Sequence, residues 1–367
     1  MKTLAAVLWE VGAPVEIVEV DLAPPQEGEV LVKIAACGVC HSDLHVVDGH
    51  LPEPLPLVLG HEASGEVVGV GPRVERLREG DHVVLALVPH CGECAACRGG
   101  RTNFCELTER MAATGTLADG TTRLSYEGTP LHHFNAVSSF AAYAVVPESA
   151  AVAIPAEVEL DAAALVGCSA LTGYGAVHNT AQVEPGSSVA VWGCGGVGLN
   201  IVQSARLAEA SPIIAVDKRP EKLEAARRLG ATDVVLAGPN EHVVGAVRTL
   251  SGGGVDYAFE VIGLQETVAE AWEAAGSGGM VVVVGLLPKG AGLTIDAWHL
   301  LDEKALKGCF LGSARIDRDI PRIVDLYREG KLQLEELLDR RIPLEELPAA
   351  FERLRAGEGI RQLVVFD

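Results

Sequence analysis

The chain has 367 residues, of which 49% are hydrophobic, and its formal net charge at pH 7 is -21. This length favours two domains, each with enough apolar material for a core of its own. Nucleic acids and anionic membranes bind basic surfaces, so the acidic excess argues against both as partners. The apolar run Met280–Pro288 is far shorter than the roughly 20 residues of a membrane-spanning helix.

The first 90 or so residues are predicted to be mainly β structure. The N-terminal run resembles a secretory signal only at its start, because Glu10 ends the apolar stretch and Val15–Val20 continues with strand-like alternation. We therefore expect a first strand of a cytoplasmic protein. Glu29–Ala35 and Gly65–Val70 are Val-rich runs bounded by Gly and Pro, which is typical of strands.

Two short motifs in this region are rich in side chains that bind metals. They are Cys40-His41-Ser42-Asp43-Leu44-His45 and Gly60-His61-Glu62. We expect both motifs at turns, where ligands from different strands can converge.

Four cysteines follow in one loop, and their spacing predicts a metal site. They are Cys91, Cys94, Cys97 and Cys105. Four thiolates form a closed tetrahedral zinc site that leaves no position open for a substrate, so its role would be structural. The alternative is an iron–sulfur cluster, because the first three spacings match a ferredoxin run. Zinc is favoured, since the last cysteine follows after seven residues rather than three and precedes Glu106 rather than Pro.

Residues 108–147 show no clear periodicity, and we expect an irregular segment there. It contains the pair His132-His133, for which we expect structural hydrogen bonds rather than a catalytic role. Nine cysteines without a secretory signal argue against a disulfide framework.

The stretch from Ser188 to Asp217 has the order of a dinucleotide-binding βαβ unit. An apolar run to Trp192 predicts a buried strand, and Leu199–Glu209 predicts a helix. Between them, Gly193, Gly195 and Gly198 form the pattern G-x-G-x-x-G. Such glycines allow a tight turn, close approach of the backbone to a pyrophosphate, and close packing of helix on strand. The helix N-terminus then offers unpaired N–H groups to the phosphates.

A second strand, Ile213–Val216, ends at Asp217, which stands where an acid binds the ribose 2′-hydroxyl. Because a carboxylate repels a 2′-phosphate, Asp217 favours NAD over NADP, although Lys218 and Arg219 soften this preference. Further buried parallel strands are predicted in the segment that follows, at Val234–Leu236, Val255–Val261 and Met280–Gly285.

Helices are predicted at Ile320–Glu329 and Leu347–Ala356, and a last strand at Gln362–Phe366. Apart from the four-cysteine loop, Cys40, His61 and Cys168 are candidates for a catalytic zinc set, which uses two Cys and one His and leaves one position open. A buried cysteine is usually a small hydrophobic side chain, and we assign Cys37, Cys194 and Cys309 to that class. Asp43 could accept a hydrogen bond from a ligating histidine.

Together these motifs make the chain resemble a zinc-dependent alcohol dehydrogenase of the medium-chain dehydrogenase/reductase family, along essentially its whole length. The motifs that carry the resemblance are C-G-V-C-H-S-D from Cys37, G-H-E from Gly60, the four-cysteine loop, G-C-S-A-L-T-G-Y-G from Gly167, G-C-G-G-V-G from Gly193 and G-I-R from Gly359.

The resemblance implies an α/β architecture of two domains. A GroES-like β domain would comprise residues 1–170 and 313–367, with the structural zinc loop at 91–105. A Rossmann domain with a doubly wound parallel sheet would comprise residues 171–312 and bind NAD. The resemblance further implies a homodimer joined through edge strands near Leu293–Leu311, with a homotetramer as the alternative.

The resemblance also implies roles for single residues. Cys40, His61 and Cys168 would hold the catalytic zinc, with Glu62 as the nearby carboxylate, so that each chain holds two zinc ions. Residues implied to bind the cofactor are His41, Thr172, Gly193, Gly195, Gly196, Val197, Gly198, Asp217, Lys222 and Arg361. The substrate would be a primary or secondary alcohol, interconverted with its aldehyde or ketone. Its oxygen would take the open zinc position, its proton would leave through Ser42, the cofactor ribose and His45, and its hydride would pass to the nicotinamide.

Leu87 replaces a large pocket aromatic of many family members, which leaves room for branched or aromatic alcohols.

Three alternatives to this hypothesis were considered. The formaldehyde dehydrogenases of the family that act on thiol adducts carry an arginine where Glu109 stands, although Arg110 is adjacent, so a glutathione adduct is the less favoured substrate. A zinc-free quinone reductase or structural relative would lack Cys40, His61 and Cys168. A zinc ribbon that binds nucleic acid conflicts with the charge of -21.

Overall fold

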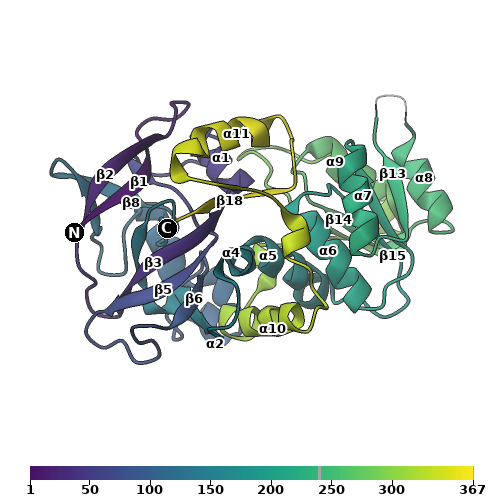
Figure 1. The fold of residues 1–367 in the computed structure, drawn as a ribbon. Helices are drawn as coiled ribbons and strands as arrows, with labels where there is room; N and C mark the ends of the chain where they lie inside the picture. The colour runs from purple at the N-terminus through teal and green to yellow at the C-terminus, as the bar shows by residue number, and fades with distance from the viewer. Residues whose placement is uncertain (239–240, 367) are drawn as a thin grey trace. The chain divides into compact units, whose positions relative to one another are not determined.

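The computed structural model describes residues 1–238 and 241–366, and the chain forms two compact units (Figure 1). The first unit comprises Met1–Cys168, Arg315–Arg328 and Leu338–Asp367. The second unit comprises Ser169–Ala314 and Glu329–Leu337. Each unit has its own hydrophobic core, and among the described residues no single helix is long and apolar enough to cross a membrane.

The first unit is built mainly from antiparallel β structure. A closed barrel contains, in order, β1 (Lys2–Leu8), β2 (Glu16–Leu22), β7 (Leu124–Tyr126), β8 (Thr129–His133) and β4 (Leu57–Val58). A sheet contains β10 (Ala151–Ile154), β6 (His82–Leu85), β5 (Ala63–Val70), β3 (Glu29–Gly38), β18 (Arg361–Val365) and β17 (Leu338–Ile342), with β9 (Tyr143–Pro147) paired to β3. Its α-helices are α1 (His41–Val47), α2 (Ala95–Arg98), α3 (Glu106–Thr114), α4 (Leu160–Ala164), α10 (Ile316–Arg328) and α11 (Leu347–Arg355).

The second unit contains a six-stranded sheet in which all strands are parallel. The strand order is β13 (Asp233–Leu236), β12 (Ile213–Asp217), β11 (Val189–Trp192), β14 (Val255–Glu260), β15 (Ala275–Val283) and β16 (Ala305–Gly308). The connecting helices are α6 (Gly196–Leu207), α7 (Pro220–Leu229), α8 (Val243–Leu250) and α9 (Gln265–Ala274), and α5 (Ser169–Gly175) precedes them. The order reverses direction beside β11, which is the switch point of a doubly wound sheet and confirms that prediction.

The segment predicted to be irregular, residues 108–147, contains regular structure, so that prediction was wrong. Helix α3 was not predicted because Met111 is its only buried residue, so its sequence lacks the repeating spacing of apolar residues that is typical of a helix. Strands β7 and β8 form a hairpin whose two loop residues, Glu127 and Gly128, both have positive φ, as a type I′ turn requires. The structural reading of the histidine pair is confirmed, since Nε2 of His133 accepts a hydrogen bond from the backbone N–H of Arg123.

One short segment lies in a different unit from the one we expected. Residues 1–170 and 313–367 were expected to form the first unit, but Glu329–Leu337 lies in the second, and the boundaries near 170 and 313 differ by two residues each. Side chains of α6 account for this, because Gln203 accepts a hydrogen bond from the backbone N–H of Gln333 and Arg206 donates one to the carbonyl of Lys331.

The two glycines of β5 provide a test of the packing between β3 and β5. A Cβ on Gly65 would lie 2.2 Å from the carbonyl oxygen of Lys33, whereas a Cβ on Gly69 would lie 3.5 Å from Leu31. We expect Gly65→Ala to lower the free energy of unfolding by about 1–3 kcal/mol, because a backbone atom in a sheet cannot move away. Urea unfolding followed by circular dichroism measures this, with Gly69→Ala as the matched control. Equal effects of the two substitutions would contradict the packing described here.

Candidate active site

Three side chains from separate segments of the first unit converge in its interior. Cys40 precedes α1, His61 lies between β4 and β5, and Cys168 follows a short 3-10 turn, Leu165–Gly167. One ligand atom from each lies within 4.8 Å of the other two, and all three residues are buried. The expected grouping of these three side chains is confirmed, although Cys168 lies more than one hundred residues from the others and could be assigned to the group only by resemblance.

Two of the three residues follow a glycine whose missing side chain lets the backbone approach its neighbours. A Cβ on Gly60 would lie 2.3 Å from the backbone nitrogen of Phe140, and Gly60 has a φ of 96°. A Cβ on Gly167 would lie 2.2 Å from the carbonyl oxygen of Leu85. His61 and Cys168 thus reach the same point because each is carried on backbone packed against other backbone.

The orientation of His61 is set by Asp43, which is fully buried. Oδ1 of Asp43 accepts a hydrogen bond from the backbone N–H of Gly60 at 2.9 Å and lies 3.3 Å from Nδ1 of His61. This confirms the expected role of Asp43. Among the described residues, Nε2 of His61 is buried without a hydrogen-bond partner, so its lone pair is available to a metal ion.

The electrostatics of the cluster favour a thiolate at Cys40. A hydrogen bond from Cys168 lowers the pKa of Cys40 well below its ordinary value, and Arg361 and His61 act in the same direction. The same hydrogen bond, together with burial, raises the pKa of Cys168. Burial alone would lower the pKa of His61, but Asp43 and Cys40 outweigh it and the pKa is raised. Thiolate is the form of cysteine that binds metals.

A buried ion pair lies beside these three side chains. A carboxylate oxygen of Glu62 lies 2.8 Å from the guanidinium of Arg361, and both side chains are almost completely buried. Arg361 also donates to the carbonyl of Val39 at 2.9 Å. The expected contact between Arg361 and a pyrophosphate stays a prediction. Within the protein, the partners of Arg361 are Glu62 and the carbonyl of Val39.

The motif that begins at Cys40 is helical, so the expected turn was wrong. Cys40 is the N-cap of α1, and the helix carries the next residues to different sides. His41 is exposed, Ser42 and His45 are half-buried, and Oγ of Ser42 lies 3.7 Å from Sγ of Cys40. A helix of seven residues is difficult to predict from sequence, because it is too short to show the repeating spacing of apolar residues that identifies a helix.

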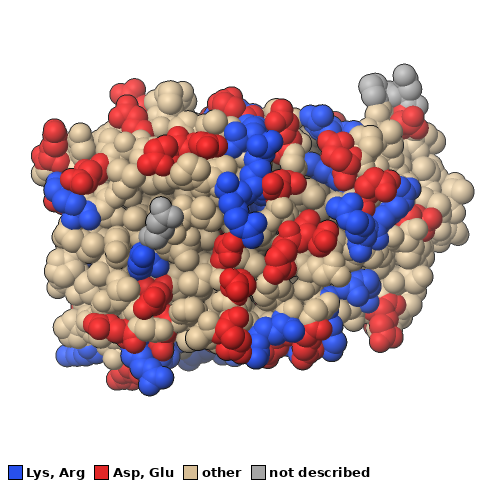
Figure 2. All heavy atoms as spheres, in the orientation of Figure 1, with Lys and Arg blue, Asp and Glu red and all other residues tan. Residues whose placement is uncertain are grey.

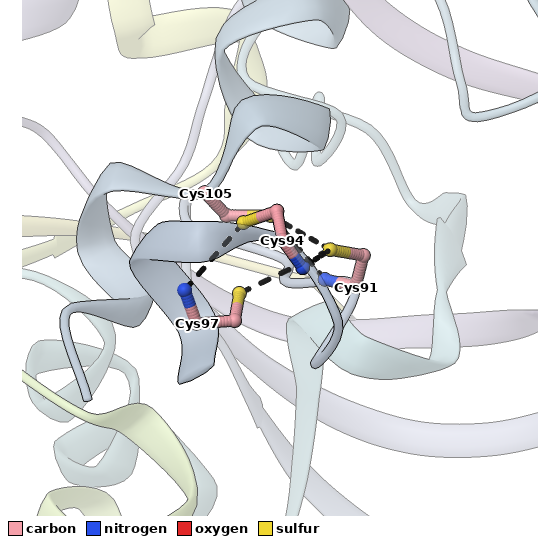
Figure 3. Close-up of side chains that lie close together, drawn as sticks. All are labelled: Cys91, Cys94, Cys97 and Cys105. Carbon is pink, nitrogen blue, oxygen red and sulfur yellow. Dashed lines mark hydrogen bonds between the residues drawn. The ribbon is translucent and has the colours of Figure 1, made fainter. Parts of the chain in front are cut away.

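The four-cysteine loop forms a second cluster in the same unit (Figure 3). The sulfur atoms of Cys91 and Cys97 are 4.0 Å apart, as are those of Cys94 and Cys105, and those of Cys105 and Cys91 are 3.6 Å apart. These separations exceed a disulfide bond of about 2.05 Å. They fit the edge of a tetrahedron around one ion, roughly 3.8 Å for metal–sulfur bonds of about 2.3 Å. The space is too small for a cluster of several iron atoms.

The glycine-rich turn lies in the second unit, and each glycine has a distinct geometry. Gly193 has a φ of 97° and makes the turn after β11. Gly195 is the N-cap of α6, and a Cβ there would meet nothing within 4 Å, which leaves its backbone open to a ligand. A Cβ on Gly198 would lie 1.8 Å from the carbonyl oxygen of Gly193, so this glycine is required by helix packing. Gly196 and Val197 complete the first turn of α6.

Asp217 is the last residue of β12 and its carboxylate lies beside this turn. It accepts hydrogen bonds from the backbone N–H of Cys194 at 2.7 Å and of Arg219 at 2.9 Å. Lys222 lies on α7 and is half-buried, and Thr172 lies on α5 and is buried.

His50 lies against His45 and was not among the site residues predicted from the sequence. Nδ1 of His50 lies 3.3 Å from Nδ1 of His45. The signal that could have revealed it is weak, since His50 lies five positions beyond His45 and outside any recognisable motif.

Comparisons with known proteins agree with this geometry. Residues 26–156 match the family model of the alcohol dehydrogenase GroES-like domain, and residues 196–329 match that of the zinc-binding dehydrogenases. A relative from Synechocystis, named S-(hydroxymethyl)glutathione dehydrogenase, is 41% identical over 99% of this chain and 100% of its own length.

Two solved structures are similar over the whole chain. An alcohol dehydrogenase zinc-binding domain protein from Burkholderia ambifaria is 39% identical with a TM-score of 0.95, over 100% of this chain and 99% of its own. Benzyl alcohol dehydrogenase from Acinetobacter calcoaceticus is 35% identical with a TM-score of 0.94, over 100% of both chains. The chain therefore belongs to the zinc-dependent alcohol dehydrogenases of the medium-chain dehydrogenase/reductase family.

Proposed function

We propose that this protein is an NAD-dependent zinc dehydrogenase that interconverts primary or secondary alcohols, including aromatic and branched ones, with their aldehydes or ketones. The observation that carries the proposal is the convergence of Cys40, His61 and Cys168 in one buried cluster. Two thiolates and one imidazole match a catalytic zinc site that keeps one position open.

Two zinc sites per chain follow from the two clusters. Cys40, His61 and Cys168 would hold the catalytic ion, and Cys91, Cys94, Cys97 and Cys105 would hold a structural ion. A zinc ion in the open site supplies Lewis acidity that lowers the pKa of a hydroxyl group, and NAD supplies the hydride acceptor. Side chains of the protein itself would provide the proton transfer and the charge balance.

Ser42 and His45 move the substrate proton. Ser42 lies next to Cys40, and its hydroxyl can accept one proton while it donates another. His45 is on the same helix, half-buried, and an imidazole gains and loses protons near neutral pH. The helix thus places a proton acceptor beside the substrate position and a second one nearer to solvent.

Glu62 and Arg361 balance the charge of the catalytic cluster. Two thiolates neutralise a divalent ion, and the carboxylate of Glu62 is neutralised by Arg361. A single buried charge left unpaired would be unfavourable by several kcal/mol, roughly 3–5 kcal/mol when one partner of such a pair is removed.

The relatives and neighbours define two substrate classes. The benzyl alcohol dehydrogenase neighbour and Leu87, where a larger aromatic is common, support alcohols with a ring or a branch. The relatives named S-(hydroxymethyl)glutathione dehydrogenase support the adduct of formaldehyde and glutathione as the second candidate. Glu109 stands where the family resemblance implies an arginine in the dehydrogenases that act on thiol adducts, which argues for the alcohols, although Arg110 is adjacent and exposed.

The main test combines zinc content with a substrate panel. We expect about one zinc ion per cluster and NADH formation with benzyl, branched and simple primary alcohols. S-Hydroxymethylglutathione belongs in the same panel. If that adduct is turned over with a kcat/KM far above every alcohol, the second candidate replaces the first.

Cys40→Ala should remove one zinc ion and lower turnover by more than about 100-fold, since even residues that only orient a metal ligand contribute about 10- to 100-fold. Cys309→Ala is the matched control, because Cys309 belongs to neither cluster. Unfolding of the Cys40→Ala variant would contradict a catalytic role and assign the first cluster to folding.

Asp217 should determine the cofactor preference. We expect wild-type protein to prefer NAD, and Asp217→Ala to reduce the NAD/NADP ratio of kcat/KM by roughly tenfold or more. The reason is that repulsion between charges about 4 Å apart is worth about 1–4 kcal/mol. Asp233→Ala, on the neighbouring strand β13, should leave the ratio unchanged. A tenfold preference of wild-type protein for NADP would contradict the assignment.

We also propose that the protein is a homodimer joined through β16. This strand is the outer edge of its sheet, and all four of its residues are exposed, among them Leu306. The neighbouring stretches of chain carry further exposed apolar side chains, at Trp298, Leu301 and Phe310. An exposed apolar edge strand favours pairing with another strand.

Leu306→Lys should therefore convert the protein to a monomer, as measured by light scattering after gel filtration. Leu236→Lys is the matched control, because Leu236 is exposed on β13 at the opposite edge of the same sheet. A monomeric wild-type protein, or a Leu306→Lys variant that stays dimeric, would refute this interface, and a wild-type tetramer would add a second one.

A further inference from the structure

A second imidazole lies against His45, on the turn that follows α1. The Nδ1 atoms of His45 and His50 are 3.3 Å apart, and the ring centroids are 5.5 Å apart with an interplanar angle of 54°. Two facing ring nitrogens at this distance share one hydrogen, which one ring donates and the other accepts.

The backbone holds this pair in place. The chain reverses at Gly49, which has a φ of 77°, and the N–H of Leu51 donates to the carbonyl of His45 at 3.0 Å. The N–H of Asp48 donates to the carbonyl of Leu44 at 2.8 Å. The turn between the two histidines is therefore tied to the helix at both of its ends, and His50 is carried back onto His45.

The pair extends from a half-buried position on α1 to solvent. His45 is half-buried on the helix that Cys40 caps, whereas His50 is exposed. Of the charged groups near His45, Asp48 is bound by Arg355. Burial and the charge of His50 lower the pKa of His45, and Cys40 and Asp48 oppose this without reversing it. His45 thus releases a proton readily at neutral pH.

We propose that His50 is the group that takes the substrate proton from His45 and delivers it to water, so that the two histidines act as one proton path. This inference rests on the proposed function. In alcohol oxidation the C–H bond breaks and its electron pair leaves as hydride to NAD, while the O–H proton must reach solvent. A proton that arrives on Nε2 of His45 releases the hydrogen on its Nδ1, which crosses to Nδ1 of His50. His50 then loses the hydrogen on its Nε2 to water, and exchange with water restores the starting tautomers.

The test measures the first turnover, because product release rather than chemistry limits kcat in many enzymes. Stopped-flow absorbance records the rate of the first NADH formed after benzyl alcohol and NAD are mixed with the holoenzyme at pH 7. We expect His50→Gln to slow this rate roughly three- to tenfold, since an acid–base group contributes about 100- to 10,000-fold and water replaces part of it. The KM for the alcohol should not change, and imidazole in the buffer should restore the rate.

A double variant separates proton transfer from a structural effect. If His50 acts only through His45, His45→Gln combined with His50→Gln is as slow as His45→Gln alone. An equal loss in both backgrounds, or no rescue by imidazole, would overturn the proposal. His50→Asn provides a second substitution should the first lower the melting temperature. His132→Gln, on β8, is a control for the loss of a distant histidine.

The outcomes also separate this inference from the proposed function. A wild-type holoenzyme that forms no NADH with any alcohol of the panel would refute both. A normal wild-type rate, a slow His45→Gln variant and an unchanged His50→Gln variant would refute only the role of His50.

Discussion

The buried carboxylate of Asp43 joins the two segments on which the catalytic cluster depends. It lies on α1, which begins after Cys40, and it binds both the backbone N–H of Gly60 and the ring of His61. A carboxylate with no exposure to solvent is stable only where such partners surround it. The same contact therefore fixes the positions of Cys40 and His61 relative to each other and leaves Nε2 of His61 free of a protein partner among the described residues. It also ties the helix that carries Ser42 and His45 to the segment of Gly60 and His61.

Charge balance explains why this interior holds so many ionisable groups. Cys40, Cys168, Asp43 and Glu62 are acidic, and Arg361 provides the permanent positive charge that the protein itself offers. A divalent ion held by this cluster would balance the two thiolates, because each thiolate contributes one negative charge. The favourable contacts are made between groups from different segments, so each pair also fixes the positions of the segments that carry it.

The sequence predicted the parts of the fold that have a local pattern. The parallel strands β11, β12 and β14, the glycine turn and the four-cysteine loop all depend on spacing within about thirty residues or fewer. The hairpin of β7 and β8 and the helix α3 were missed, because their apolar residues are too few to set a period. Cys168 could be grouped with Cys40 and His61 only by resemblance, since its approach depends on Gly167 packing against β6 across the fold. His50 was missed for the same reason, since only the reversal at Gly49 brings it to His45.

The net charge of -21 is compatible with a cofactor that is itself an anion. On the face shown in Figure 2, acidic side chains are interspersed with basic ones and do not form one continuous field. Charges farther apart than about 8 Å are largely screened at physiological salt, so the groups next to the pyrophosphate decide its affinity. At α6, where we propose that the pyrophosphate binds, these would be backbone N–H groups at the positive end of a helix of 12 residues, with the open backbone of Gly195 at its start. The same local rule supports the proposed role of Asp217 in cofactor selection, because its carboxylate lies beside that helix start and accepts a hydrogen bond from the backbone N–H of Cys194.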